Sequence, residues 1–173
     1  QCGIATFTND LSSAFNSISN GHEMTSSVTA LNDVPEGYKY TKEVKFEIKD
    51  KSINDFKEAA YYLNLSDKDL INLQHEFGLY GGEAGSHILY LLENLKKPVV
   101  TTFHTVLENP DEDQLKVIEE ISRYSSYLIV QSDRSFDILE KIYGINKEKI
   151  VHIPHGAHDV PFLDTSYYKD KFQ

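Results

Sequence analysis

Apolar residues recur along this chain with two different periods, one typical of helices and one typical of strands. In the first segment the apolar side chains are spaced near 3.6 residues: Ile4, Phe7, Leu11, Phe15 and Ile18. This spacing predicts an amphipathic helix over about residues 5–20, entered through a turn at Gly3.

The next segment predicts two strands and a helix. A short strand is expected near residues 27–31, followed by a turn at Pro35 and Gly37. Residues 44–48 then alternate apolar and charged side chains with the period of two that marks a half-exposed strand. A helical stripe over 53–65 follows Ser52, which resembles the first residue of a capping box.

From residue 70 onward, short apolar runs alternate regularly with helical segments. The runs are "LINLQHE", "PVVTTFHT", "YLIVQS" and "IVHIPHG", and the helices between them are predicted over 84–95, 111–124 and 133–143. Apolar strands between helices are typical of a parallel sheet covered on both faces. The sequence therefore predicts a Rossmann-like α/β fold, a doubly wound and mostly parallel sheet.

The pattern also predicts the extent of the domain. We expect one domain over residues 1–158, and we expect residues 159–173 to be a linker toward a further, C-terminal domain. Gly3 lies where a helix would follow a strand, so the first strand of the fold is expected to precede it.

Composition narrows the class of partner. The net charge is −10 and the sequence pI is near 5.1, which disfavours nucleic acid and anionic lipid as ligands. The single cysteine, Cys2, excludes an internal disulfide framework and favours a cytoplasmic location. No apolar stretch approaches the length of a membrane span, so there is no strong membrane signal.

Polar side chains follow the predicted strands where each one ends. They are His75 with Glu76, His104 with Thr105, Ser132, and His155 with Gly156. Ligands of open α/β sheets bind outside the carboxyl ends of the strands, so we expect a ligand cleft among these residues. Gly3 would lie at the same edge, where a bare backbone and a helix N-terminus favour an anion.

A glycine-rich stretch, "EFGLYGGEAG", follows the predicted strand that ends at His75. Such a loop could present Phe77 and Tyr80 as a stacking surface for a sugar ring. Alternatively, Phe77 could simply fill the core.

Two other kinds of site are disfavoured by spacing. The histidines at 75, 87 and 104 fit no compact metal-ligand pattern, so no metal site is expected. Asp33 lies near the end of a strand, as a ribose-binding acid would, but "CGIATF" has one glycine where a dinucleotide fingerprint has three. No cofactor is expected.

Five motifs in order resemble one family. "CGIATFTNDL", "QHEFGLYGG", "PVVTTFHTVL", "LIVQS" and "VHIPHGAHDVPF" are similar to the N-terminal domain of the family 4 (group 1) glycosyltransferases. These are retaining enzymes of the GT-B fold that move a sugar from a nucleotide donor. No such motif is found in residues 22–51.

The resemblance implies roles for particular residues. His104 matches the family's histidine near the reacting centre and is the implied catalytic residue. The implied donor-binding residues are Gly3, Ser132, His155 and Gly156, although the family commonly has asparagine where His155 stands. The acceptor-binding residues proposed from the strand-end and loop positions are His75, Glu76, Phe77 and Tyr80.

The implied partners are a nucleotide-sugar donor, a carbohydrate acceptor and the C-terminal domain in cis, which in the family holds most donor contacts. This chain would then carry the acceptor side of a hexosyltransferase and be inactive alone. Two alternatives stay open: half of a GT-B epimerase or phosphorylase, or a domain that binds a glycan or a partner without catalysis.

Overall fold

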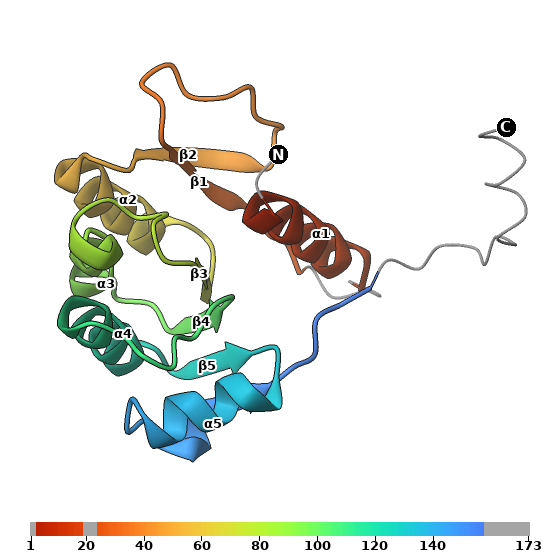
Figure 1. Ribbon diagram of the computed structural model, residues 1–173. Helices are drawn as coiled ribbons and strands as arrows, with labels where there is room; N and C mark the ends of the chain where they lie inside the picture. The colour runs from red at the N-terminus through yellow and green to blue at the C-terminus, as the bar shows by residue number, and fades with distance from the viewer. Residues whose placement is uncertain (1–2, 19–23, 158–173) are drawn as a thin grey trace, which may run out of the picture.

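The computed structural model describes residues 3–18 and 24–157 (Figure 1). The helices are α1 (Gly3–Ile18), α2 (Ile53–Leu65), α3 (Ile88–Asn94), α4 (Glu112–Tyr124) and α5 (Asp133–Lys141), with short 3₁₀ turns η1 (Glu83–Gly85) and η2 (Lys147–Lys149). The strands are β1 (Val28–Asn32), β2 (Val44–Lys49), β3 (Ile71–His75), β4 (Val99–Phe103), β5 (Tyr127–Val130) and β6 (Ile150–His152). The predicted linker over 159–173 lies outside the described residues.

The strands form two parallel sheets. One sheet has four strands in the order β3-β4-β5-β6, and the other pairs β1 with β2. Parallel neighbours joined through helices are what the alternation of apolar runs predicts. The predicted α/β class and its mostly parallel, Rossmann-like sheet are confirmed.

The helices lie on both sides of the strands. Figure 1 shows α2, α3 and α4 together on one side, and α1 on the other. The close packing of α2 against α3 and of α3 against α4 builds a continuous layer over that first face. Both faces of the fold therefore carry helices, but they are unequally covered.

Local sequence explains where the helices begin. Asp111 caps α4 by accepting a hydrogen bond from the backbone N–H of Gln114 at 2.8 Å, and the Gln114 side chain accepts one from the Asp111 N–H at 2.9 Å. This reciprocal arrangement satisfies two N–H groups that the helix leaves unpaired. Ser52 caps α2 without such a reciprocal bond: its hydroxyl accepts from the backbone N–H of Asp55 and donates to the Asp55 carboxylate.

The core lies between the strands and the layer of α2, α3 and α4. Phe56 of α2 and Phe103 of β4 are essentially inaccessible to solvent. Thr101 of β4 is also buried, and its hydroxyl is 2.7 Å from that of Ser125, which donates to the Ile121 carbonyl. The buried hydroxyls of Thr101 and Ser125 are therefore satisfied within the protein.

Two details differ from the sequence prediction. The helix expected over 84–95 is broken, because Ala84 and Gly85 have positive φ angles of 50° and 80°, which end η1 before α3 begins. Gly3 is the first residue of α1 rather than a turn before it. The predicted end of that helix at Asn20 lies outside the described residues.

Candidate functional site

A cluster of polar side chains lies at the carboxyl ends of β3 and β4, on the face opposite the core. In β3, Leu73 and His75 point into the core, so the alternation of a strand turns Gln74 and Glu76 to the other face. In β4 the buried Phe103 has the same effect on His104. We call Gln74, Glu76, His104 and Thr105 the carboxyl-edge cluster.

His104 is half-buried and held by its neighbour on β3. Its Nε2 lies 2.8 Å from Oε1 of Gln74, so the Nε2–H donates and Nδ1 carries the lone pair. The Gln74 amide N–H₂ donates in turn to Oδ1 of Asn72, which fixes the amide with its oxygen toward the imidazole. This chain of bonds presents Nδ1 as an acceptor for a ligand hydroxyl.

Glu76 is fixed by two hydrogen bonds. Oε2 accepts from the Thr105 hydroxyl at 2.7 Å, and Oε1 accepts from the backbone N–H of Phe77 at 3.0 Å. The carboxylate therefore joins the residues that follow β3 to those that follow β4. Acceptor lone pairs on both oxygens are left for a hydroxyl donor.

The surroundings of His104 lower its pKa and so favour the neutral imidazole. Burial lowers the pKa of His104, the Glu76 carboxylate raises it, and His155 lowers it again. Burial is the largest of these effects because it disfavours the charged imidazolium. A neutral imidazole can accept and donate at once, which suits contact with a sugar hydroxyl.

An aromatic residue of α1 covers this histidine. The ring of Phe7 lies edge-on to His104, with centroids 4.8 Å apart, and also meets His155 at 5.4 Å. His155 is exposed and its Nδ1–H donates to the Gly156 carbonyl oxygen at 2.7 Å. Phe7 thus brings α1, the end of β4 and the segment after β6 together.

His75 is a correction to the predicted acceptor site. Its side chain is fully buried and packs against the rings of Phe77, Tyr80 and Phe103. Neither ring nitrogen has a hydrogen-bond partner within the described residues, and burial lowers the pKa of His75 to about 4. A neutral histidine enclosed in this way does not contact an acceptor.

Tyr80 and the glycine-rich loop are a second correction. Tyr80 is buried, its hydroxyl donates to the Gln74 carbonyl at 2.6 Å, and burial raises its pKa. A Cβ on Gly81 would lie 2.1 Å from the Asp50 carbonyl oxygen, and one on Gly82 would lie 2.6 Å from the ring of His87. The glycines allow the loop to pack closely around His87, rather than presenting Tyr80 for stacking.

The remaining predicted residues follow the ends of β3 and β5 or begin α1. Phe77 is half-buried next to Glu76. Gly3 is exposed at the N-terminus of α1, with open space around the position of a Cβ. Ser132 caps α5, where its hydroxyl accepts from the N–H of Ser135 at 3.1 Å. The Ser132 side chain therefore already has a structural role.

Two contributors to the site were not predicted. Gln74 holds His104, and Phe7 covers the imidazole. Thr105, a predicted strand-end residue, holds Glu76. The period of two in β3 could have indicated Gln74. This alternation places Gln74 on the same face of the sheet as Glu76, next to the neighbouring strand β4. No signal in the sequence shows which face of α1 meets His104.

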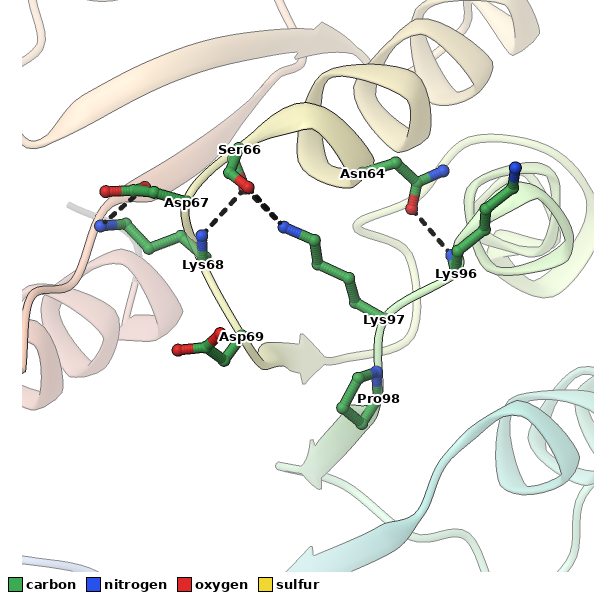
Figure 2. A pocket seen from close by; sticks show the side chains of 8 residues that line it. All are labelled: Asn64, Ser66, Asp67, Lys68, Asp69, Lys96, Lys97 and Pro98. Carbon is green, nitrogen blue, oxygen red and sulfur yellow. Dashed lines mark hydrogen bonds and ion pairs between the residues drawn. The ribbon is translucent and has the colours of Figure 1, made fainter.

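The hollow in Figure 2 lies at the opposite edge of the sheet, before β3 and β4 begin. It is lined by Asn64, Ser66, Asp67, Lys68, Asp69, Lys96, Lys97 and Pro98. Lys97 Nζ donates to the Ser66 carbonyl at 2.7 Å, and Lys68 Nζ contacts both Asp67 and the Thr25 hydroxyl. These lysines tie the loops at the amino ends of the strands together.

Metal and membrane features are absent from the described part of the chain. Within residues 3–18 and 24–157, no three His, Cys, Asp or Glu side chains gather closely enough to hold a metal ion. None of the helices in the same ranges has both the length and the apolar character needed to cross a bilayer.

Fold and site together define a Rossmann-like α/β domain with a histidine-centred polar cluster at the carboxyl edge of its sheet. Comparison of the chain with protein-family models, with curated proteins and with solved structures finds no match in any of the three. The resemblance to glycosyltransferases therefore stays a prediction from the motifs.

Proposed function

We propose that this domain is the acceptor-side half of a retaining glycosyltransferase that uses a nucleotide-sugar donor. The observation that carries the proposal is the bonding of His104, a neutral imidazole whose Nε2–H is committed to Gln74 while Nδ1 is left as an acceptor. It lies beside an ordered carboxylate, Glu76, at the edge where α/β sheets bind ligands.

In this function the cluster binds and orients a sugar. A hydroxyl donates to Nδ1 of His104, and a second hydroxyl donates to Glu76. Both groups are fixed before the ligand arrives, so little ordering is required at the reacting centre. Donor and acceptor identity depend on contacts beyond this cluster.

Activity assays test the proposal. The isolated chain should give no transfer above a blank with a panel of nucleotide sugars and carbohydrate acceptors. Joined in cis to a nucleotide-sugar-binding domain, it should transfer, and His104→Ala should reduce turnover about 10²-fold if the imidazole contributes about 3 kcal/mol to the transition state.

The matched control is His152→Ala. His152 lies on β6, which β5 separates from β4, and its Nδ1 lies 2.8 Å from Asp133, so its loss should leave the carboxyl-edge cluster intact and turnover unchanged. Robust turnover by the isolated chain contradicts the two-domain proposal. Normal turnover by a folded His104→Ala variant contradicts the role of His104.

A further inference from the structure

The loop between β4 and α4 begins with two residues of the carboxyl-edge cluster, His104 and Thr105. Its start is fixed by β3, because the His104 N–H donates to the His75 carbonyl at 3.0 Å. Its end is fixed by Asp111, the cap of α4. Residues 105–110 belong to no helix or strand, so side-chain contacts from elsewhere decide where the middle of the loop lies.

A tyrosine that follows α5 holds the middle of this loop. Tyr143 is buried, and its hydroxyl donates to the Leu107 carbonyl at 3.1 Å. Burial raises the pKa of Tyr143, so the hydroxyl keeps its proton at neutral pH and remains a donor. The backbone N–H of Tyr143 bonds to the Ile138 carbonyl at 3.3 Å. The end of α5 therefore fixes the tyrosine that in turn fixes the loop.

The start of α5 contacts the next residue of the same loop. Oε1 of Glu108 accepts from Arg134, with Nε at 2.9 Å and Nη2 at 2.7 Å. Both side chains are largely exposed, so this pair is weak and is screened by salt. The hydrogen bond of the buried Tyr143 is therefore the contact between α5 and the loop that persists at high salt.

The residue that Tyr143 holds lies close in the chain to one that shapes the site. Thr105 and Leu107 flank Val106, whose side chain packs against the core. The Thr105 hydroxyl donates to Oε2 of Glu76 at 2.7 Å. A loop released at Leu107 gains backbone conformations, and their entropy favours states in which Thr105 no longer reaches Glu76.

We propose that Tyr143 is a positioning residue for the carboxyl-edge cluster. By holding the Leu107 carbonyl, its hydroxyl keeps Thr105 against Glu76, the carboxylate assigned to a sugar hydroxyl. Tyr143 acts through the backbone of the loop. Its effect on turnover rests on the proposed function, whereas its effect on the loop does not.

NMR on the 173-residue chain tests the effect on the loop. Tyr143→Phe removes the hydroxyl and keeps the ring. The side-chain couplings of Thr105 should change from those of one rotamer to an average over several. The Phe77 N–H, which donates to the same carboxylate, should shift. Replacing Tyr143 by 4-aminophenylalanine supplies an N–H donor at the same place and should restore both signals.

Tyr124→Phe is the matched control. Its hydroxyl lies on α4, 3.5 Å from Nη2 of the exposed Arg123, so its loss should leave Thr105 and Phe77 unchanged. If Tyr143→Phe is folded and its Thr105 couplings equal those of the wild type, the proposal is overturned. A lower melting temperature with an unchanged loop overturns it too, because Tyr143 would then be only a packing residue.

Kinetics test the effect on the site in the chain joined to a nucleotide-sugar-binding domain. Tyr143→Phe should lower kcat/KM for the carbohydrate acceptor about 10-fold, because Glu76 is less well oriented. The KM for the nucleotide sugar should stay unchanged, and 4-aminophenylalanine should restore the acceptor value. Normal acceptor kinetics with a released loop would overturn the positioning role. If the wild-type fusion transfers no sugar, the proposed function fails, and the NMR comparison still decides what Tyr143 does to the loop.

Discussion

Replacing His75 by leucine should stabilise the protein, and by more at acidic pH than at neutral pH. The imidazole is fully buried among three aromatic rings, and neither nitrogen is bonded within the described residues. An unsatisfied buried polar group costs about 1–3 kcal/mol. Leucine has a similar volume and no polar atoms, so His75→Leu should raise the free energy of unfolding by about that amount near pH 7.5.

The acid effect follows from the pKa of His75, which falls from its ordinary 6.5 to about 4 on burial. The unfolded chain binds the proton more readily, so the stabilising effect of the neutral form is complete above pH 6.5 and is lost as the pH falls toward 4. The full change in the pKa of His75, from 6.5 to about 4, corresponds to about 3 kcal/mol, of which about 2 kcal/mol is lost by pH 5.

Urea unfolding of both proteins at about pH 7.5 and about pH 5 measures this difference. The two proteins carry the same carboxylates, so the difference between their free energies of unfolding isolates the effect of His75. This difference, in favour of His75→Leu, should grow by about 2 kcal/mol between about pH 7.5 and about pH 5. The exposed His155, changed to leucine, controls for loss of a histidine as such. A pH dependence that is identical with and without His75 would refute the buried, neutral imidazole.

Substitutions at three further places have definite expected outcomes: the glycine-rich loop, Ser132 and Glu76. Gly81→Ala should lower the free energy of unfolding by more than about 2 kcal/mol in thermal melts, whereas Gly78→Ala, in open space at φ 84°, should cost only about 1 kcal/mol; equal losses would contradict the close packing. Ser132→Ala should lose about 1 kcal/mol and Ser132→Asp should restore it; a failure of aspartate to rescue contradicts a purely capping role. Glu76→Gln removes the charge that raises the pKa of His104, so in NMR titration the imidazole should protonate at lower pH; an unchanged or higher value contradicts the pairing.

The fold was largely predictable because its strands and caps are local signals. The alternation in β2 predicts its pattern of buried and exposed positions, and Asp111 with Gln114 forms the expected capping box. The break between η1 and α3 was missed because Ala84 adopts a positive φ, which its residue type does not favour.

The site was less predictable because a position at a strand end does not by itself indicate which face of the sheet the side chain lies on. His75 and His104 both end strands, yet His75 points into the core and His104 points to the opposite face. The period of two separates them once Leu73 and Phe103 are placed in the core. The partners of His104 come from distant segments, Gln74 of β3 and Phe7 of α1, and pairing of this kind depends on the tertiary packing.

Mapping carbohydrate binding onto the chain tests the central claim most directly. Backbone and imidazole NMR signals are followed while a panel of oligosaccharide acceptors is added at increasing concentration. The account predicts shifts concentrated at Gln74, Glu76, His104 and Thr105, with the Nδ1 signal of His104 responding most. Shifts confined to the hollow of Figure 2, or an unperturbed carboxyl-edge cluster with every acceptor in the panel, would contradict it.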